Sequence, residues 1–234
     1  MIITNSTPDT YYYEQLIAFL MSIKINSPKH MELIKVFLAN YPDEKLLKLR
    51  ESFSEVEFEN NELKMIDKRG FATIIDRAFR VGDCLKTFKD SVLWMDTDII
   101  VRGDLSNLVQ VKSKQLKILY RKEAPERVKI NAGVFNIGYS DISYKFIKDW
   151  HSRILRNKKW GNGQLEFWRV FKKYRKNIEM TNITKKYNSA GRHFEKDCIV
   201  WHCKMSHFNS PIYQKEYQKY LAEAKKYMEA MTNG

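Results

Sequence analysis

The chain has 234 residues, of which 44% are hydrophobic and 13% aromatic, a composition typical of a folded globular protein that excludes a disordered chain. Its formal net charge of +13 favours an anionic partner, such as a nucleotide phosphate, a nucleic acid or an acidic membrane face. No apolar run reaches the ~20 residues of a membrane-spanning helix. The N-terminus lacks a secretory signal, and three cysteines suit a reducing compartment, so we expect a cytoplasmic protein, in the host cytoplasm if the source is viral.

Strands and helices alternate along the chain. The predicted strands are residues 1–5, 31–39, 56–58, 92–95, 116–120, 133–137 and 199–202. The predicted helices are residues 12–24, 42–52, 74–88, 142–155, 164–174 and 211–231. This alternation predicts an α/β fold with a mainly parallel sheet. Since the chain has no internal repeat and no long linker, we expect one domain over residues 1–210, followed by a helical tail over residues 211–234.

The most informative segment is the apolar run 92–95, which Asp96 and Asp98 follow. Residues i and i+2 of a strand point the same way, so both carboxylates are predicted to lie on one side of a strand end. Two such carboxylates repel unless a cation lies between them, and Mg²⁺ or Mn²⁺ prefers oxygen ligands and keeps positions open for phosphates. The alternative is that Asp-x-Asp only marks a turn after a buried strand.

Three later segments follow the aspartate pair along the chain, and their order supports a family resemblance. They are Asn131-Ala132-Gly133-Val134-Phe135-Asn136-Ile137-Gly138, Gly161-Asn162-Gly163-Gln164 and Trp201-His202-Cys203-Lys204. Together with the run VLWMDTDIIVRGDLSNL at residues 92–108, they resemble the glycogenin-like and bacterial lipopolysaccharide galactosyltransferase-like glycosyltransferases of the GT-A fold. The resemblance covers about residues 2–208. It implies a Rossmann-like central sheet flanked by helices, and transfer of a sugar from a nucleotide-sugar donor.

The resemblance also implies a cofactor, Mn²⁺ or Mg²⁺. Asp96 and Asp98 would hold the metal, Asp96 would also reach the ribose, and His202 would be the third protein ligand. Lys204 would contact the diphosphate as a point charge. His207 is a rival to His202 as the histidine ligand.

On the donor side, the resemblance implies that Thr4, Asn5 and Tyr11 seat the nucleobase. Arg77 matches a basic residue that helps to bind the donor, and Arg80 is the alternative because the local register is uncertain.

The sugar pocket would contain Asn131, Ala132 and Gln164, and the catalytic group would comprise Gln164, Asn131 and Asp98. In retaining relatives the glutamine lies beneath the sugar ring, so retention of configuration is expected here. The alternatives are a turn for Asn131 and an ordinary first-turn helix position for Gln164. Two positions depart from the family pattern: Gly163 replaces an acidic residue that binds donor-sugar hydroxyls, and Met205 replaces a glycine after the histidine.

The implied partners are a UDP-sugar donor and a glycan, protein or lipid-linked acceptor, with no nucleic acid. The basic, partly amphipathic helix at 211–231 suggests peripheral contact with a membrane or another subunit. Among the tryptophans, Trp160 in a polar loop is the candidate for stacking on an acceptor sugar.

Three other functions compete with sugar transfer. A nucleotidyltransferase would share the fold and the metal-held diphosphate but would release pyrophosphate. A non-catalytic nucleic-acid-binding protein would rest on the +13 charge, and its binding would fall with salt and ignore Asp96. Zinc could bind the Cys198-x3-His202-Cys203-x3-His207 group, although a strand through residues 199–201 would splay these ligands.

Overall fold

The computed structural model describes residues 1–62, 69–157, 163–190, 196–202 and 211–232. The chain forms two compact units. Unit 1 contains residues 1–3, 64–95 and 106–184, and unit 2 contains residues 4–63, 96–105 and 185–234. Each unit therefore consists of three separate segments of the sequence.

Seven strands form one sheet with the order β3-β2-β1-β4-β7-β6-β8. These strands are β1 (Ile2–Ser6), β2 (Ile34–Ala39), β3 (Glu57–Asn61), β4 (Val92–Met95), β6 (Gln115–Tyr120), β7 (Ile130–Ile137) and β8 (Glu179–Asn182). The pairs β1–β4, β2–β3 and β6–β8 are parallel, whereas β7 is antiparallel to both of its neighbours. The prediction of an α/β fold with a mainly parallel sheet is thus confirmed.

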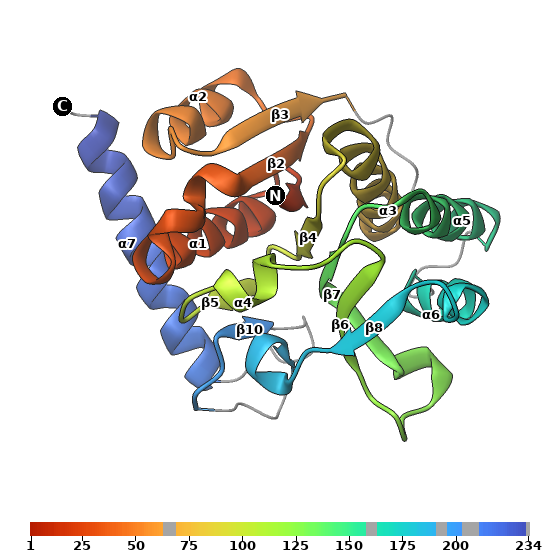
Figure 1. Cartoon of the computed structure of the whole chain (residues 1–234). Coiled ribbons are helices and arrows are strands. Elements are labelled where there is room, and N and C mark those ends of the chain that lie inside the picture. The colour runs from red at the N-terminus through yellow and green to blue at the C-terminus, as the bar shows by residue number, and fades with distance from the viewer. Residues whose placement is uncertain (63–68, 158–162, 191–195, 203–210, 233–234) are drawn as a thin grey trace. The chain divides into compact units, whose positions relative to one another are not determined.

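Unit 1 contains strands β4, β7, β6 and β8. Its helices are α3 (Arg69–Phe88), the short α4 (Ser106–Val109), α5 (Asp141–Asn157) and α6 (Gly163–Tyr174), together with the 3-10 turn η2 (Glu126–Val128). Helices α3 and α4 pack against β4, and α6 packs against β7. Every residue of β7 is buried, as expected for a strand inside a sheet. Helix α5 lies beside both α3 and α6 (Figure 1). Edge-to-face ring contacts among Phe135, Phe146, Trp150 and Phe167 connect β7, α5 and α6.

Unit 2 is built around α1 (Thr10–Asn26), in which residues 15–23 are all buried. The unit also contains η1 (Pro28–Leu33), α2 (Asp43–Ser52), η3 (Lys185–Tyr187) and α7 (Pro211–Thr232). A second, three-stranded sheet has the order β5-β10-β9, with β5 (Ile99–Val101), β9 (Ser189–Ala190) and β10 (Val200–His202). Helix α7 runs along α1 (Figure 1).

Helix α7 covers unit 2 with its apolar side. The buried residues are Tyr213, Tyr217, Tyr220, Leu221, Ala224 and Met228. Tyr220 accepts a hydrogen bond from Asn26 at the end of α1 (Nδ2–OH 2.8 Å), and the ring of Tyr213 meets Trp201 of β10. The amphipathic pattern in the sequence is thus used for packing inside the unit. Within the described residues, no helix combines the length and the apolar character needed to cross a membrane.

The sequence predicts most elements to within a few residues, and β4 without error. Residues 31–33 are wrongly predicted as strand, because Pro28 opens a 3-10 helix that continues to Leu33. Strands β5, β8 and β9 were not predicted. They have only three, four and two residues and depend on pairing partners distant in the sequence.

Candidate metal centre

Asp96, Thr97 and Asp98 form the connection between β4, which ends at Met95, and β5, which begins at Ile99. The expectation that strand pleating aligns the two carboxylates is wrong, because neither aspartate lies in a strand. The two side chains converge because the chain turns between two short buried strands. Both remain accessible, with exposed side-chain fractions of 20% for Asp96 and 21% for Asp98.

His202 reaches these carboxylates through pairing between β10 and β5. The strands are antiparallel, and His202 lies opposite Ile99, the residue directly after Asp98. Its Nε2 atom is 3.1 Å from Asp98 Oδ1 and 3.6 Å from Asp96 Oδ2. One ligand atom from each residue fits within 4.8 Å of the others. The structure therefore brings together the three residues that the sequence resemblance assigns to the metal.

The Asp98 carboxylate has the features of a metal ligand rather than of an ion-pair partner. Its Oδ1 atom is buried and accepts no hydrogen bond from the described residues, although His202 Nε2 is only 3.1 Å away. The imidazole therefore does not direct an N–H bond at this oxygen. Two carboxylate oxygens and a ring nitrogen that converge in this way form a donor set suited to Mg²⁺ or Mn²⁺.

Asn188 contacts the far side of the same imidazole. Its Oδ1 atom is 3.3 Å from His202 Nδ1, and both side chains are buried. Sequence reasoning missed this residue. Its contact depends on the pairing of β9 with β10, which sets Ala190 opposite His202 and which no local pattern reveals.

Thr4, Asn5 and Tyr11, the expected nucleobase residues, also belong to unit 2. Thr4 and Asn5 lie in β1, which runs parallel to β4 with Ile3 opposite Trp94, so Asn5 and Asp96 lie at the carboxyl ends of neighbouring strands. Thr4 is fully buried, and its Oγ1 atom has no hydrogen-bond partner among the described residues. Tyr11 lies in the first turn of α1, with its ring edge-on to Tyr12.

A second cluster, in unit 1, joins three residues of the expected donor pocket. Arg77 donates from NH1 to the carbonyl oxygen of Ala132 (3.0 Å), and the backbone N–H of Ala132 donates to Gln164 Oε1 (3.0 Å). The Arg77 guanidinium also lies 5.1 Å from the centre of the Trp94 ring. Ala132 is thus held on both sides, by α3 and by the first turn of α6.

The alternative residue Arg80 pairs with Asp76 one helical turn away on α3 (Nε–Oδ1 3.0 Å), and both side chains are buried. Asn131 lies inside β7 rather than in a turn, so the turn interpretation is wrong. Its side chain is fully buried, and Oδ1 accepts a hydrogen bond from the N–H of Gly133 (3.0 Å).

The first turn of α6, which carries Gln164, is anchored from two sides. Trp150 of α5 donates its indole N–H to the carbonyl oxygen of Gly163 (3.0 Å). Glu166 is 1% exposed, and its carboxylate accepts hydrogen bonds of 2.8 Å from Arg153, Asn157 and Arg169. These contacts fix the position from which Gln164 meets Ala132.

Several expected site residues lie outside the described part of the chain, namely Trp160, Cys203, Lys204, Met205 and His207. Of the proposed zinc group, Cys198 and His202 are described. The sulfur of Cys198 lies 3.7 Å from Arg102 NH1, which donates to it, whereas His202 faces the aspartates.

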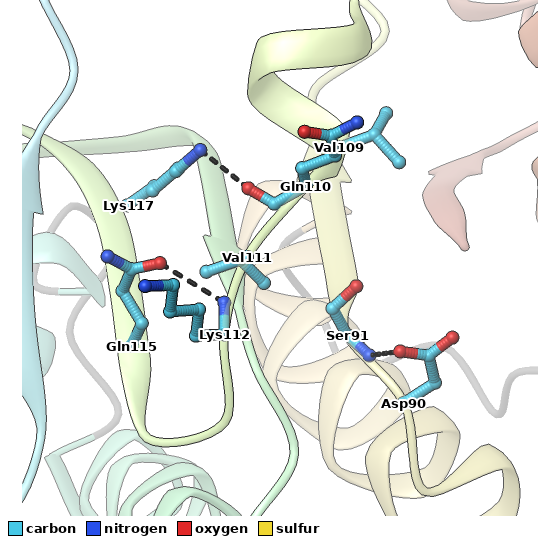
Figure 2. A pocket seen from close by; sticks show the side chains of 8 residues that line it. All are labelled: Asp90, Ser91, Val109, Gln110, Val111, Lys112, Gln115 and Lys117. Carbon is cyan, nitrogen blue, oxygen red and sulfur yellow. Dashed lines mark hydrogen bonds between the residues drawn. The ribbon is translucent and has the colours of Figure 1, made fainter.

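Unit 1 also has an open pocket of about 630 Å³. It is lined by Asp90, Ser91, Val109, Gln110, Val111, Lys112, Gln115 and Lys117 (Figure 2). Several of its polar groups pair with one another or with the nearby backbone. Lys117 donates to the carbonyl oxygens of Asn107 and Gln110, and Gln115 accepts from the N–H of Lys112. Burial lowers the pKa of the Lys117 amine below its ordinary value. These pairings give no indication of a ligand.

No protein-family model matches the sequence, and no curated protein matches it either. Solved structures do match. The galactosyltransferase LgtC, crystallised with donor and acceptor sugar analogs, is 13% identical with a TM-score of 0.62, and the match covers 93% of this chain and 95% of LgtC.

Two further matches are to parts of longer proteins. The glycosyltransferase GlyE of Streptococcus pneumoniae is 16% identical with a TM-score of 0.63, and the match covers 95% of this chain and 63% of GlyE. The bifunctional glycosyltransferase WbbM is 13% identical with a TM-score of 0.68, and the match covers 97% of this chain and 51% of WbbM. At these identities the likeness is one of fold, and the chain has the GT-A fold of these glycosyltransferases, as the sequence resemblance predicts.

Proposed function

We propose that this protein is a metal-dependent glycosyltransferase that moves a sugar from a nucleotide-sugar donor, a UDP-sugar, to an acceptor hydroxyl with retention of configuration. The observation that carries the proposal is the convergence of Asp96, Asp98 and His202, whose ligand atoms lie within 4.8 Å of one another. The GT-A fold supports it, because LgtC, GlyE and WbbM, which match this fold, are glycosyltransferases.

Asp96, Asp98 and His202 would hold Mn²⁺ or Mg²⁺, and the buried Oδ1 of Asp98, which accepts no hydrogen bond from the described residues, fits this role. When bound, the metal supplies positive charge that stabilises the diphosphate as it leaves the sugar. Lys204 would add a second positive charge at the diphosphate. An oxygen-rich set with one imidazole suits these hard cations better than it suits zinc.

Arg77, Asn131, Ala132 and Gln164 would bind the donor sugar. Because Ala132 is hydrogen-bonded through both its carbonyl oxygen and its N–H, this wall of the pocket is preorganised. Gln164 Oε1 accepts the hydrogen bond from the N–H of Ala132. Its amide nitrogen, Nε2, would then donate to a sugar oxygen. Gly163 offers no acid to the sugar hydroxyls, so sugar selectivity would rest on other residues.

The acceptor would be a glycan, a protein or a lipid-linked sugar, in keeping with the acceptor sugar analog bound to LgtC. Peripheral contact with an anionic membrane would use the exposed lysines of α7, Lys215, Lys219 and Lys226, because the apolar side of the helix is buried in unit 2.

The test measures release of nucleoside diphosphate from a panel of UDP-, GDP- and TDP-sugars with and without Mn²⁺. Asp96→Asn and Asp98→Asn should each lower kcat/KM by at least ~100-fold, since removal of a ligand costs several kcal/mol of transition-state stabilisation. Asp104→Asn is a matched control, because this nearby aspartate is 55% exposed and pairs with Lys29 on the surface. Its activity should stay within about twofold of the wild type.

Other outcomes would support the competing functions. Release of pyrophosphate instead of a nucleoside diphosphate would indicate a nucleotidyltransferase. Binding of nucleic acid that falls steeply with salt and is unchanged in Asp96→Asn, without turnover of any donor, would indicate a non-catalytic binding protein.

A further inference from the structure

Asn188 is the buried residue that contacts His202 on the side away from the aspartates. It lies between η3 and β9, it is fully buried, and its Oδ1 atom is 3.3 Å from His202 Nδ1. Its own backbone N–H donates to the carbonyl oxygen of Lys185 (3.3 Å). A turn and a short strand therefore fix the position of this amide.

The contact determines which ring nitrogen carries the proton. An amide oxygen can only accept a hydrogen bond, so Nδ1 of His202 must be the donor. In the neutral ring, Nε2 then presents a lone pair. This atom is the one that faces Asp98 Oδ1 at 3.1 Å and Asp96 Oδ2 at 3.6 Å.

We infer that Asn188 is a positioning residue of the metal centre, which holds His202 in the Nδ1-protonated tautomer and turns Nε2 towards the cation site. The inference rests on the proposed function, because it assigns a role towards the proposed metal. Histidine ligands of metals usually donate their second N–H to an outer partner of this kind, and removing that partner typically weakens metal binding 10–100-fold.

The strand pairing explains why this amide and this imidazole meet. Strands β9 and β10 are parallel, with Ser189 opposite Trp201 and Ala190 opposite His202. The backbone N–H of Ile199 donates to the carbonyl oxygen of Lys186, which ties the start of β10 to η3 (2.7 Å). Asn188 thus directly precedes β9, a strand of the same three-stranded sheet that brings His202 to the aspartates.

The first measurement is the dissociation constant of Mn²⁺ for the full chain, by titration calorimetry without nucleotide. Asn188→Asp keeps an acceptor oxygen at the same place, so its dissociation constant should stay within about threefold of the wild type or fall. Asn188→Leu has similar volume and no acceptor, so its dissociation constant should rise 10–100-fold. If Asn188 served only in packing, Asn188→Asp should raise the dissociation constant of Mn²⁺ more than Asn188→Leu does. The reason is that an uncompensated buried carboxylate is tolerated less well than a leucine.

Asn136→Leu is the matched control. Asn136 is also fully buried, but it belongs to unit 1 and donates to the carbonyl oxygens of Leu108 and Val109. This variant should lower the melting temperature and leave the dissociation constant of Mn²⁺ unchanged. Equal dissociation constants for Asn188→Leu and the wild type would overturn the inference, whereas a wild type that binds no Mn²⁺ would overturn the proposed function.

A second measurement determines the tautomer of His202 directly in the wild type. In the metal-free wild type at pH 8, labelled with ¹⁵N-histidine, long-range ¹H–¹⁵N couplings identify the tautomer of each of the five histidines. His202, assigned by loss of its signals in His202→Gln, should be protonated at Nδ1. Protonation at Nε2 would overturn the inference.

Discussion

Asp96, Asp98 and His202 bring three electron-rich atoms together at one point of unit 2. Without a cation this arrangement is unfavourable, because the two carboxylates repel each other and His202 Nε2, at 3.6 and 3.1 Å from them, is not shown to donate a hydrogen bond to the buried Oδ1 of Asp98. The same repulsion is what makes the set attractive to a divalent ion. The cluster therefore lowers the stability of the metal-free protein and favours the binding of a divalent ion.

Asp98→Asn should stabilise the metal-free protein at pH 8, above the range in which histidine ordinarily titrates. The change removes one negative charge, and the new amide can donate to His202 Nε2, so we expect the free energy of unfolding to rise by about 0.5–2 kcal/mol. Thermal denaturation with EDTA measures this gain. With Mn²⁺ added instead, the wild type should gain stability and the variant should not.

The control for this prediction is again Asp104→Asn, whose surface pair with Lys29 contributes at most about 1 kcal/mol. It should keep the response to Mn²⁺. A metal-free Asp98→Asn variant that melts below the wild type would contradict the prediction.

The sequence predicted the identity of the clustered residues better than the reason for their clustering. Asp96 and Asp98 were found from two carboxylates after an apolar strand, and His202 from a resemblance in motif order. The alignment of the aspartates was attributed to strand pleating, whereas the structure has them in the turn between β4 and β5. Asn188 could not be found at all, because its contact with His202 spans 14 residues and depends on strand pairing.

The first turn of α6 is the clearest case in which one element holds another. The carboxylate of Glu166 receives hydrogen bonds from two arginines and an asparagine, and Trp150 holds the carbonyl oxygen of Gly163. Because α5 supplies Trp150, Arg153 and Asn157, the two helices behave as one support for Gln164.

Glu166→Gln should lower the free energy of unfolding by about 1.5–3 kcal/mol, since it weakens charge-assisted hydrogen bonds to a buried group. The loss should stay below that of a fully buried ion pair, because the side chains of Arg153 and Arg169 are 35% and 40% exposed and water can solvate them. Urea denaturation measures the change.

Glu126→Gln provides the comparison, because Glu126 pairs with Lys172 in an exposed position, so this change should lower the free energy of unfolding much less than Glu166→Gln. Equal losses of unfolding free energy in the two variants would contradict the prediction, because they would show that the buried Glu166 cluster stabilises the protein no more than a surface ion pair.

Helices and strands with long periodic patterns were predicted well. Short strands that form only by pairing with strands distant in the sequence were not. Helix α5 repeats Phe146, Trp150 and Ile154 at helical spacing, and all three are buried. Strand β7 extends three residues further towards the N-terminus than predicted, so that it includes Asn131 and Ala132. Its antiparallel direction was not foreseen, because residue periodicity does not reveal strand direction.

At the scale of the whole molecule, α7 is an integral part of unit 2. Six of its side chains are buried, and Lys225 pairs with Glu14 of α1 (2.7 Å). The sequence suggests a domain boundary at residue 210, whereas the burial along α7 predicts that residues 1–210 need this helix to fold.

We expect a chain truncated after residue 210 to lose its cooperative unfolding transition, because the buried side of α1 would be exposed to water. A milder form of the test is Tyr213→Ala, which should cost about 3–5 kcal/mol, in the range for large aromatic side chains. Ile212→Ala is its control, since Ile212 is 56% exposed. A truncated chain that unfolds cooperatively near the temperature of the full chain would support the boundary at 210.

The division of each unit into three sequence segments has a consequence for synthesis on the ribosome. His202 follows Asp98 by 104 residues, which takes about 5–20 s at ~5–20 residues per second. During that interval β5 has been synthesised but its partner β10 has not. The apolar edge of β5 that pairs with β10 is therefore exposed and unpaired. Nascent chains that stall in this interval carry both aspartates but no metal centre, and their open edge makes them prone to aggregation and suitable clients for chaperones.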